Sequence, residues 1–107
     1  MRALFQALAA MLLMMMTQIA LAQEGEEKGR QLAQTMCAHC HAIGKWERSP
    51  LAGAPPFRQL EPQVDFDELQ ERLQEGIVAG HPAMPMFVFS PGEARALVNY
   101  LRTIRGP

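Results

Sequence analysis

The hydrophobic positions of this chain form one long apolar run at the N-terminus and three later stretches with helical spacing. The run lies between Arg2 and Glu24, and no charged residue interrupts it. It starts beside one positive charge and ends in Ala20-Leu21-Ala22, a small-x-small pattern typical of a secretory cleavage site. We therefore expect residues 1–22 to be a signal peptide that is removed on export. The alternative is an uncleaved membrane anchor, because a run of this length nearly crosses a bilayer.

The first two helical stretches begin with acidic residues, as the helix dipole favours. The first covers about residues 24–36, where glutamates precede basic residues and apolar residues recur at helical spacing. The second begins at Asp65, whose spacing from Glu68 resembles a capping box. The apolar positions of this second helix are Phe66, Leu69, Leu73 and Ile77, with Val78 as a further candidate.

The third helical stretch has the clearest start in the sequence. Ser90-Pro91-Gly92-Glu93 combines an N-cap serine, a proline at the first helical position and a glutamate three residues after the cap. This helix is expected to end near Ile104, just before Gly106 and Pro107. Its inner stripe is Ala94, Leu97, Val98, Leu101 and Ile104, with Tyr100 next to it.

Two irregular segments separate these helices. In residues 42–62, four prolines and two glycines break both helical and strand periodicity. An irregular loop of this length in a small domain is either functional or disordered, and its apolar residues indicate that it wraps another group. The second segment is Gly80-His81-Pro82-Ala83-Met84-Pro85-Met86-Phe87, whose prolines exclude regular structure and restrict the backbone.

Size and charge restrict the core and the partners. Residues 23–107 are 85 residues with nine Lys or Arg and eleven Asp or Glu, a formal charge of −2. This balance argues against nucleic acid as a partner, because neutralising phosphates requires a basic surface. We expect residues 23–107 to form one domain, with room for only a thin core.

The most specific chemical signal is Cys37-Ala38-His39-Cys40-His41, which is the C-x-x-C-H attachment pattern of a c-type haem. In this pattern Cys37 and Cys40 each form a thioether to the porphyrin edge, and His41 ligates the iron. The haem would supply the apolar mass that so short a chain lacks. Because c-type haem is joined to its protein outside the cytoplasm, the motif and the export signal support each other.

Two other chemistries use closely spaced cysteines. A redox-active C-x-x-C sits near a βαβ pattern, and no strong strand signal surrounds this one. A structural zinc site usually has four ligands, and beyond the motif only His81 is a candidate soft ligand. The chain has no other cysteine, which excludes a disulfide scaffold. Within the motif, His39 is expected to be a spacer that faces solvent.

The order of these features resembles the small bacterial class I c-type cytochromes. That family has an N-terminal helix ending in C-x-x-C-H, a proline-containing loop under the haem, a further helix, a Met-Pro loop, and a C-terminal helix with an aromatic residue. The similarity covers about residues 24–105. It implies an all-α fold of three to four short helices and long loops, wrapped around one covalently attached haem c.

The resemblance also implies the second axial ligand. Met84, followed directly by Pro85, takes the position of the distal sulfur, so that His41 and Met84 would hold the iron. Met86 and His81 stay open as alternatives, because each is a side chain of the same segment that can ligate iron.

Further positions follow from the same resemblance. Pro55 matches the residue whose carbonyl accepts the proximal imidazole N–H, which would orient His41. Phe57 would pack against the porphyrin. Gly29 and Tyr100 match the pair at which the first and last helices cross.

An iron with both axial positions filled is suited to passing one electron. The expected function is therefore that of a soluble one-electron carrier in a periplasmic redox chain, not an enzyme, with donor and acceptor proteins as partners. Membrane contact is expected only if the N-terminal run is retained. Alternatives are the cytochrome subunit of a periplasmic dehydrogenase or oxidase complex, and a haem sensor or enzyme with an open sixth position.

Overall fold

Three α-helices and one short 3-10 helix form the framework of the protein. The structure is a computed structural model, and it describes residues 1–76 and 83–106. In chain order the elements are α1 (Arg2–Met36), η1 (Phe57–Gln59), α2 (Phe66–Glu75) and α3 (Pro91–Ile104). Within the described residues there is no β-strand. The expected all-α fold is confirmed.

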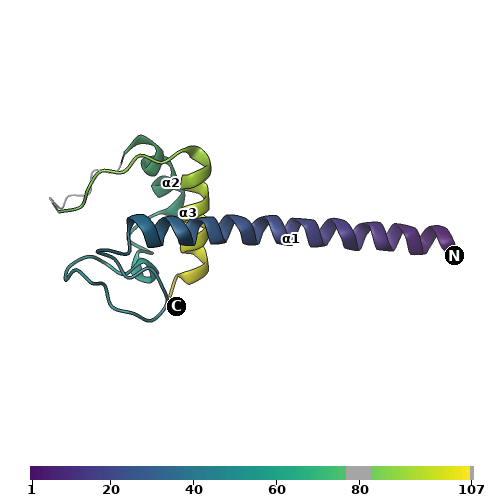
Figure 1. The fold of residues 1–107 in the computed structure, drawn as a ribbon, viewed down its shortest axis with the longest axis horizontal. Helices are drawn as coiled ribbons and strands as arrows, with labels where there is room; N and C mark the ends of the chain where they lie inside the picture. Colours follow the sequence, from purple (N-terminus) through teal and green to yellow (C-terminus); the bar gives the residue numbers. More distant parts are fainter. Residues whose placement is uncertain (77–82, 107) are drawn as a thin grey trace.

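α1 is much longer than the helix expected over 24–36, since it begins at Arg2. Leucine, alanine and methionine dominate residues 3–22, and all three favour the helix, with no proline or glycine to end it. Figure 1 shows this part of α1 extending away from the rest of the molecule, and its side chains are exposed. It is long and apolar enough to cross a membrane, and its place at the N-terminus also suits a signal sequence.

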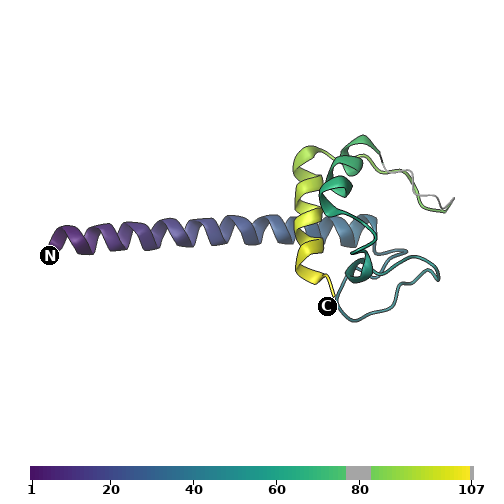
Figure 2. The ribbon, with the colours of Figure 1, turned by 180° about the vertical axis from the view of Figure 1, so that it is seen from behind.

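The C-terminal part of α1 crosses α3 at Gly29, which is buried (Figures 1 and 2). A Cβ atom built on Gly29 would lie 2.6 Å from the backbone carbon of Ala96 and 2.8 Å from the Cβ of Tyr100. Only a glycine allows the two backbones to approach so closely. The predicted crossing of Gly29 and Tyr100 is confirmed.

α2 starts as predicted, because the Asp65 carboxylate accepts hydrogen bonds from the backbone N–H groups of Asp67 and Glu68, at 2.8 and 3.0 Å. Its end differs from the prediction, which extended the apolar stripe to Ile77. The helix ends at Glu75, since Gly76 has a φ of 104°, a left-handed conformation that glycine adopts without strain. Residues 77 and 78 lie outside the described part of the chain.

α3 has the predicted capping box: Glu93 N–H donates to Ser90 Oγ at 3.2 Å, and Ser90 N–H donates to Glu93 Oε1 at 3.1 Å. Its inner stripe is buried as expected and packs against both α1 and α2. The backbone N–H of Phe89 donates to the carbonyl of Leu73 at 2.8 Å, which holds the segment before α3 against α2. The resulting core contains Ala33, Phe57, Phe66, Leu73, Phe89, Ala94, Leu97, Val98, Tyr100, Leu101 and Ile104.

We expect Gly29→Ala to destabilise the fold, because the added methyl group meets the backbone of α3, which cannot move without shifting the helix. The expected loss in the free energy of unfolding is about 1–3 kcal/mol, in spite of the gain of about 1 kcal/mol in helix propensity. Gly25→Ala is the matched control, since nothing lies within 4 Å of a Cβ there. Urea unfolding followed by circular dichroism measures both. Equal stabilities of the two variants would contradict the close crossing.

Candidate cofactor site

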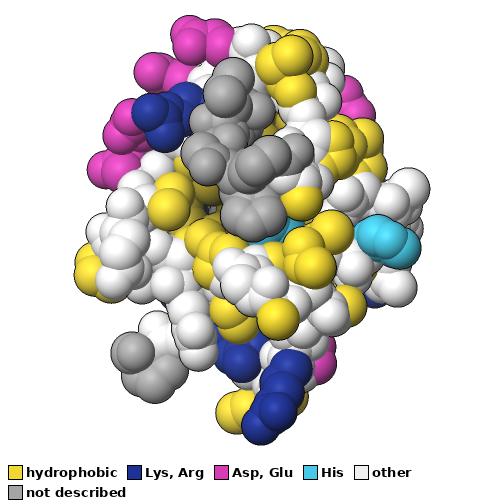
Figure 3. Space-filling model, turned by 90° about the vertical axis from the view of Figure 1, so that its left-hand side faces the viewer, with side chains coloured by type: hydrophobic (Ala, Val, Ile, Leu, Met, Phe, Trp, Pro, Cys, Tyr) yellow, Lys and Arg dark blue, Asp and Glu magenta, His cyan; other side chains and the backbone are white. Residues whose placement is uncertain are grey.

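A cavity of about 470 Å³ opens at the end of the molecule that lies opposite the projecting part of α1. Its volume is in the range of small-molecule and cofactor sites. Figure 3 views this end and shows hydrophobic side chains gathered around the opening. The lining comes from the end of α1, the loop that follows it, α2, residues 83–89 and α3, and most of it is apolar. The apolar lining residues include Met36, Leu51, Ala54, Phe57, Leu60, Val64, Leu69, Leu73, Ala83, Met84, Phe87, Phe89, Leu97 and Leu101.

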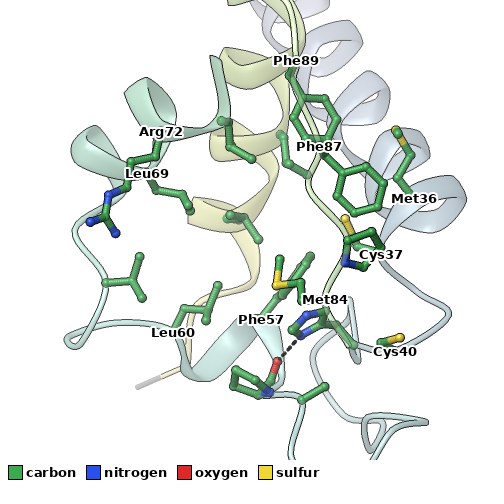
Figure 4. A pocket seen from close by; sticks show the side chains of 18 of the residues that line it. Met36, Cys37, Cys40, Phe57, Leu60, Leu69, Arg72, Met84, Phe87 and Phe89 are labelled. Carbon is green, nitrogen blue, oxygen red and sulfur yellow. Dashed lines mark hydrogen bonds between the residues drawn. The ribbon is translucent and has the colours of Figure 1, made fainter. Parts of the chain in front are cut away.

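The C-x-x-C-H motif forms one wall of the cavity (Figure 4). α1 ends at Met36, and two hydrogen bonds continue the chain as a turn: Cys40 N–H and His41 N–H both donate to the Cys37 carbonyl, at 3.1 and 2.9 Å. The turn places Cys37, Cys40 and His41 together at the cavity. The two cysteines are not joined in a disulfide. His39 is exposed, as expected of a spacer.

The His41 ring is held by two partners. Its Nδ1 lies 2.8 Å from the carbonyl oxygen of Pro55, so the hydrogen bond that the resemblance implies is present (Figure 4). The ring of Phe57 lies beside it, with centroids 4.9 Å apart and a tilt of 34°. Phe57 is buried and lines the cavity. With Nδ1 bonded to a carbonyl, Nε2 is the nitrogen left for a metal.

The backbone after His41 is fixed by contacts that the sequence did not reveal. Ala42 N–H donates to Ser49 Oγ at 3.0 Å, and Phe57 N–H donates to the Ala42 carbonyl at 3.0 Å. The Tyr100 hydroxyl donates to the carbonyl of Ile43 at 2.6 Å. The capacity of serine and tyrosine to form such bonds is visible in the sequence, but their partners are set by the fold.

The two methionines of the segment before α3 lie differently. Met84 lines the cavity, is partly buried, and points into it (Figure 4). Met86 is 66% exposed and does not line the cavity. Its sulfur lies close to Gly76, 3.2 Å from a Cβ built on that residue. The third candidate ligand, His81, lies outside the described residues.

The cavity is weakly charged. Burial raises the pKa of the Cys37 thiol to about 11, so this thiol is protonated at neutral pH. The charged lining side chains are Asp65, Glu68 and Arg72. Figure 4 shows Arg72 on the side of the cavity away from the cysteines. Arg72 Nε lies 3.4 Å from Glu68 Oε1, and both side chains are well exposed, so this ion pair adds little stability.

The donor set fits a covalently attached haem better than the two alternative chemistries. Two thiols and an imidazole lie on one wall, and a thioether lies in the same cavity among apolar side chains. A structural zinc ion takes four ligands, and the described residues hold no group of three His, Cys, Asp or Glu side chains suited to a metal ion. A redox-active cysteine pair needs a lowered thiol pKa, whereas that of Cys37 is raised.

Comparison with known proteins gives two matches. Residues 24–101 match the family described as "Cytochrome C oxidase, cbb3-type, subunit III". The chain is also similar to cytochrome c-552 of Bradyrhizobium diazoefficiens, with 31% identity over 77 residues, which are 72% of each chain. No solved structure matches the chain significantly. The family match contains the C-x-x-C-H motif and most of α3, and it leaves out the apolar N-terminal run.

The buried hydroxyl of Tyr100 is expected to make the stability of the protein depend on pH. Burial is the main cause that raises the pKa of its hydroxyl above the ordinary value of 10; Glu47 and Glu27 raise it further, while Arg30 lowers it. The folded protein therefore favours the neutral hydroxyl. The resulting stability is fully present below pH 10 and is lost as the pH rises through the pKa of the folded state.

We therefore expect the free energy of unfolding to fall more steeply above pH 10 in the wild type than in Tyr100→Phe. Below pH 10 the variant should be less stable by about 1 kcal/mol, the usual worth of one hydrogen bond. Because the chain has one tyrosine, the difference between the two proteins isolates this group. Urea unfolding between pH 7 and pH 11 measures it. Parallel curves for the two proteins would rule out a titrating Tyr100 hydroxyl.

Proposed function

This chain belongs to the family of small c-type cytochromes, and we propose that it is a one-electron carrier outside the cytoplasm whose haem iron is ligated by His41 and Met84. Family membership gives electron transfer by a c-type haem as the general function. Our proposal concerns the two iron ligands, the compartment of the protein and its place in a redox chain.

The observation that carries the proposal is the gathering of four sulfur and nitrogen donors on one apolar cavity. Cys37, Cys40 and His41 come from the turn after α1, and Met84 comes from the segment before α3. The two cysteines would attach the porphyrin and the other two side chains would hold the iron. An apolar lining of this kind suits a cofactor of low polarity.

The different positions of the two methionines support Met84 as the second axial ligand. Met84 already points into the cavity that His41 lines. Met86 lies close to Gly76, is largely exposed and does not line the cavity, so its side chain would have to move to reach an iron held there. In a regular strand, residues two positions apart, such as Met84 and Met86, point to the same side. Residues 84–86 do not form a strand and Pro85 lies between the two methionines, so their side chains can point in different directions.

When bound, haem supplies an iron that cycles between the ferric and ferrous states. The Met84 thioether favours the ferrous state, and burial disfavours the extra charge of the ferric state. The hydrogen bond from His41 to Pro55 fixes the ring and makes it a stronger donor. If His41 and Met84 both ligate the iron, no position would be open for oxygen or peroxide, and the site would suit electron transfer and not oxygen chemistry.

The export proposal rests on residues 1–22. Their apolar helix with Arg2 before it and Ala20-Leu21-Ala22 at its end suits a signal that is cleaved to leave residues 23–107. The cleaved domain would be soluble in the periplasm, and retention of the helix would tie it to the membrane.

A second candidate is a cytochrome subunit of a larger oxidase or dehydrogenase complex. The match to the family named for subunit III of a cbb3-type oxidase favours it. Both candidates use the same haem site, so they differ only in assembly. Gel filtration of native extract separates them, because a free carrier elutes near the size of an 85-residue protein and a subunit elutes with its complex.

The ligand proposal is tested by paired variants of the haem-loaded protein. Met84→Ala should abolish the weak absorption band of the methionine–iron bond at the red end of the spectrum and should allow carbon monoxide to bind. Met86→Ala should leave the spectrum unchanged, since its side chain is outside the cavity. It is the matched control, as it removes the same side chain two residues away.

The reverse result, with the band lost in Met86→Ala alone, would show that Met86 is the ligand. A wild-type protein that lacks the band and binds carbon monoxide rapidly would contradict a closed iron site, and would instead favour the sensor or enzyme alternative.

A further inference from the structure

We propose that Tyr100 and Ser49 are positioning residues for His41, which they hold through the backbone of the two residues that follow it. The inference rests on the proposed function, in which His41 is an axial ligand of the iron. Neither side chain lines the cavity, so both would act through the loop and not by touching the cofactor.

The backbone on each side of His41 is fixed by a different part of the chain. On the N-terminal side, His41 N–H donates to the Cys37 carbonyl, which ties it to the turn after α1. On the C-terminal side, Ala42 is only 1% exposed, and both of its backbone polar groups are bonded, to Ser49 and Phe57. Loss of one such partner leaves a buried N–H group unpaired, which is costly.

Tyr100 adds a contact between distant segments of the chain. Its Cβ lies at the crossing with Gly29, where a phenylalanine would pack equally well. The hydroxyl has a separate role from packing: it donates a hydrogen bond to the carbonyl of Ile43 at 2.6 Å. One side chain therefore joins α1, α3 and the loop that carries His41.

These restraints act on the hydrogen bond between His41 and Pro55. The ring can stay 2.8 Å from the Pro55 carbonyl only while the backbone of residues 41–43 keeps its position. A looser loop would weaken this bond, and a weaker bond makes the imidazole a poorer donor. A poorer donor stabilises the ferric iron less, so the midpoint potential should rise.

Tyr100→Phe tests the role of the hydroxyl in the haem-loaded protein. We expect a higher midpoint potential than in the wild type and a changed NMR chemical shift of the His41 Nδ1–H proton in the ferrous protein, because this proton forms the bond to Pro55. The methionine–iron band and the helix content should be retained. Thr103→Val is the matched control, because it removes a hydroxyl of α3 that donates to the Tyr100 carbonyl within the same helix. It should leave both readouts unchanged.

A second pair of variants keeps the inference testable if Tyr100→Phe folds poorly. Ser49→Ala removes the acceptor of the Ala42 N–H and should shift the potential in the same direction. Ser49→Thr keeps a hydroxyl and should restore the wild-type values.

A folded, haem-loaded Tyr100→Phe or Ser49→Ala protein with the wild-type potential and the wild-type chemical shift of the His41 Nδ1–H proton would overturn the positioning role. An equal shift in Thr103→Val would overturn it as well. These results differ from a failure of the proposed function, which would show as a wild-type protein without haem in the pyridine haemochrome assay.

Discussion

The close crossing of α1 and α3 at Gly29 is the contact on which the rest of the structure depends. It lets the two backbones meet without a side chain between them, and it sets where α1 ends relative to α3. The C-x-x-C-H turn begins one residue after that end, so the crossing also sets where the thiols and the imidazole lie. Tyr100 at the same crossing holds the loop that follows. The crossing of α1 and α3 therefore positions both the helices of the fold and the residues of the candidate site.

The cavity takes the place that a core would occupy in a chain of this size. Five residues of the buried core also line the cavity: Phe57, Leu73, Phe89, Leu97 and Leu101. A small domain buries too little surface to be stable by its own core alone. A large apolar cofactor, fixed by two covalent bonds, would complete that core. Contacts with such a cofactor would also help to hold the long loop of residues 42–62 in place.

Local signals in the sequence predicted most of the framework. The capping residues of α2 and α3 lie within a few positions of the groups they bond, so the sequence alone predicts where both helices start. The C-x-x-C-H motif is equally local and is predicted in the same way. The full length of α1 does not follow from the export pattern of the N-terminal run, because that pattern says nothing of the helix propensity of its residues. The end of α2 was missed because an apolar stripe says nothing of the conformation of Gly76.

Contacts between distant segments could not be predicted in this way. Spacing alone does not separate Met84 from Met86, and the structure separates them because only Met84 lines the cavity. The partners of Ser49 and Tyr100 lie seven and 57 residues away, so they exist only in the folded chain. The Pro55 contact was expected from resemblance, and not from any physical rule that applies to the loop.

The intact mass of the protein, produced in cells that attach c-type haem and measured under denaturing conditions, tests the covalent site most directly. The expected mass is that of residues 23–107 plus one haem, with the added mass on the peptide that contains Cys37 and Cys40. A chain of that length without the added mass, or a haem that dissociates on denaturation, would contradict the assignment of the cavity to a c-type haem.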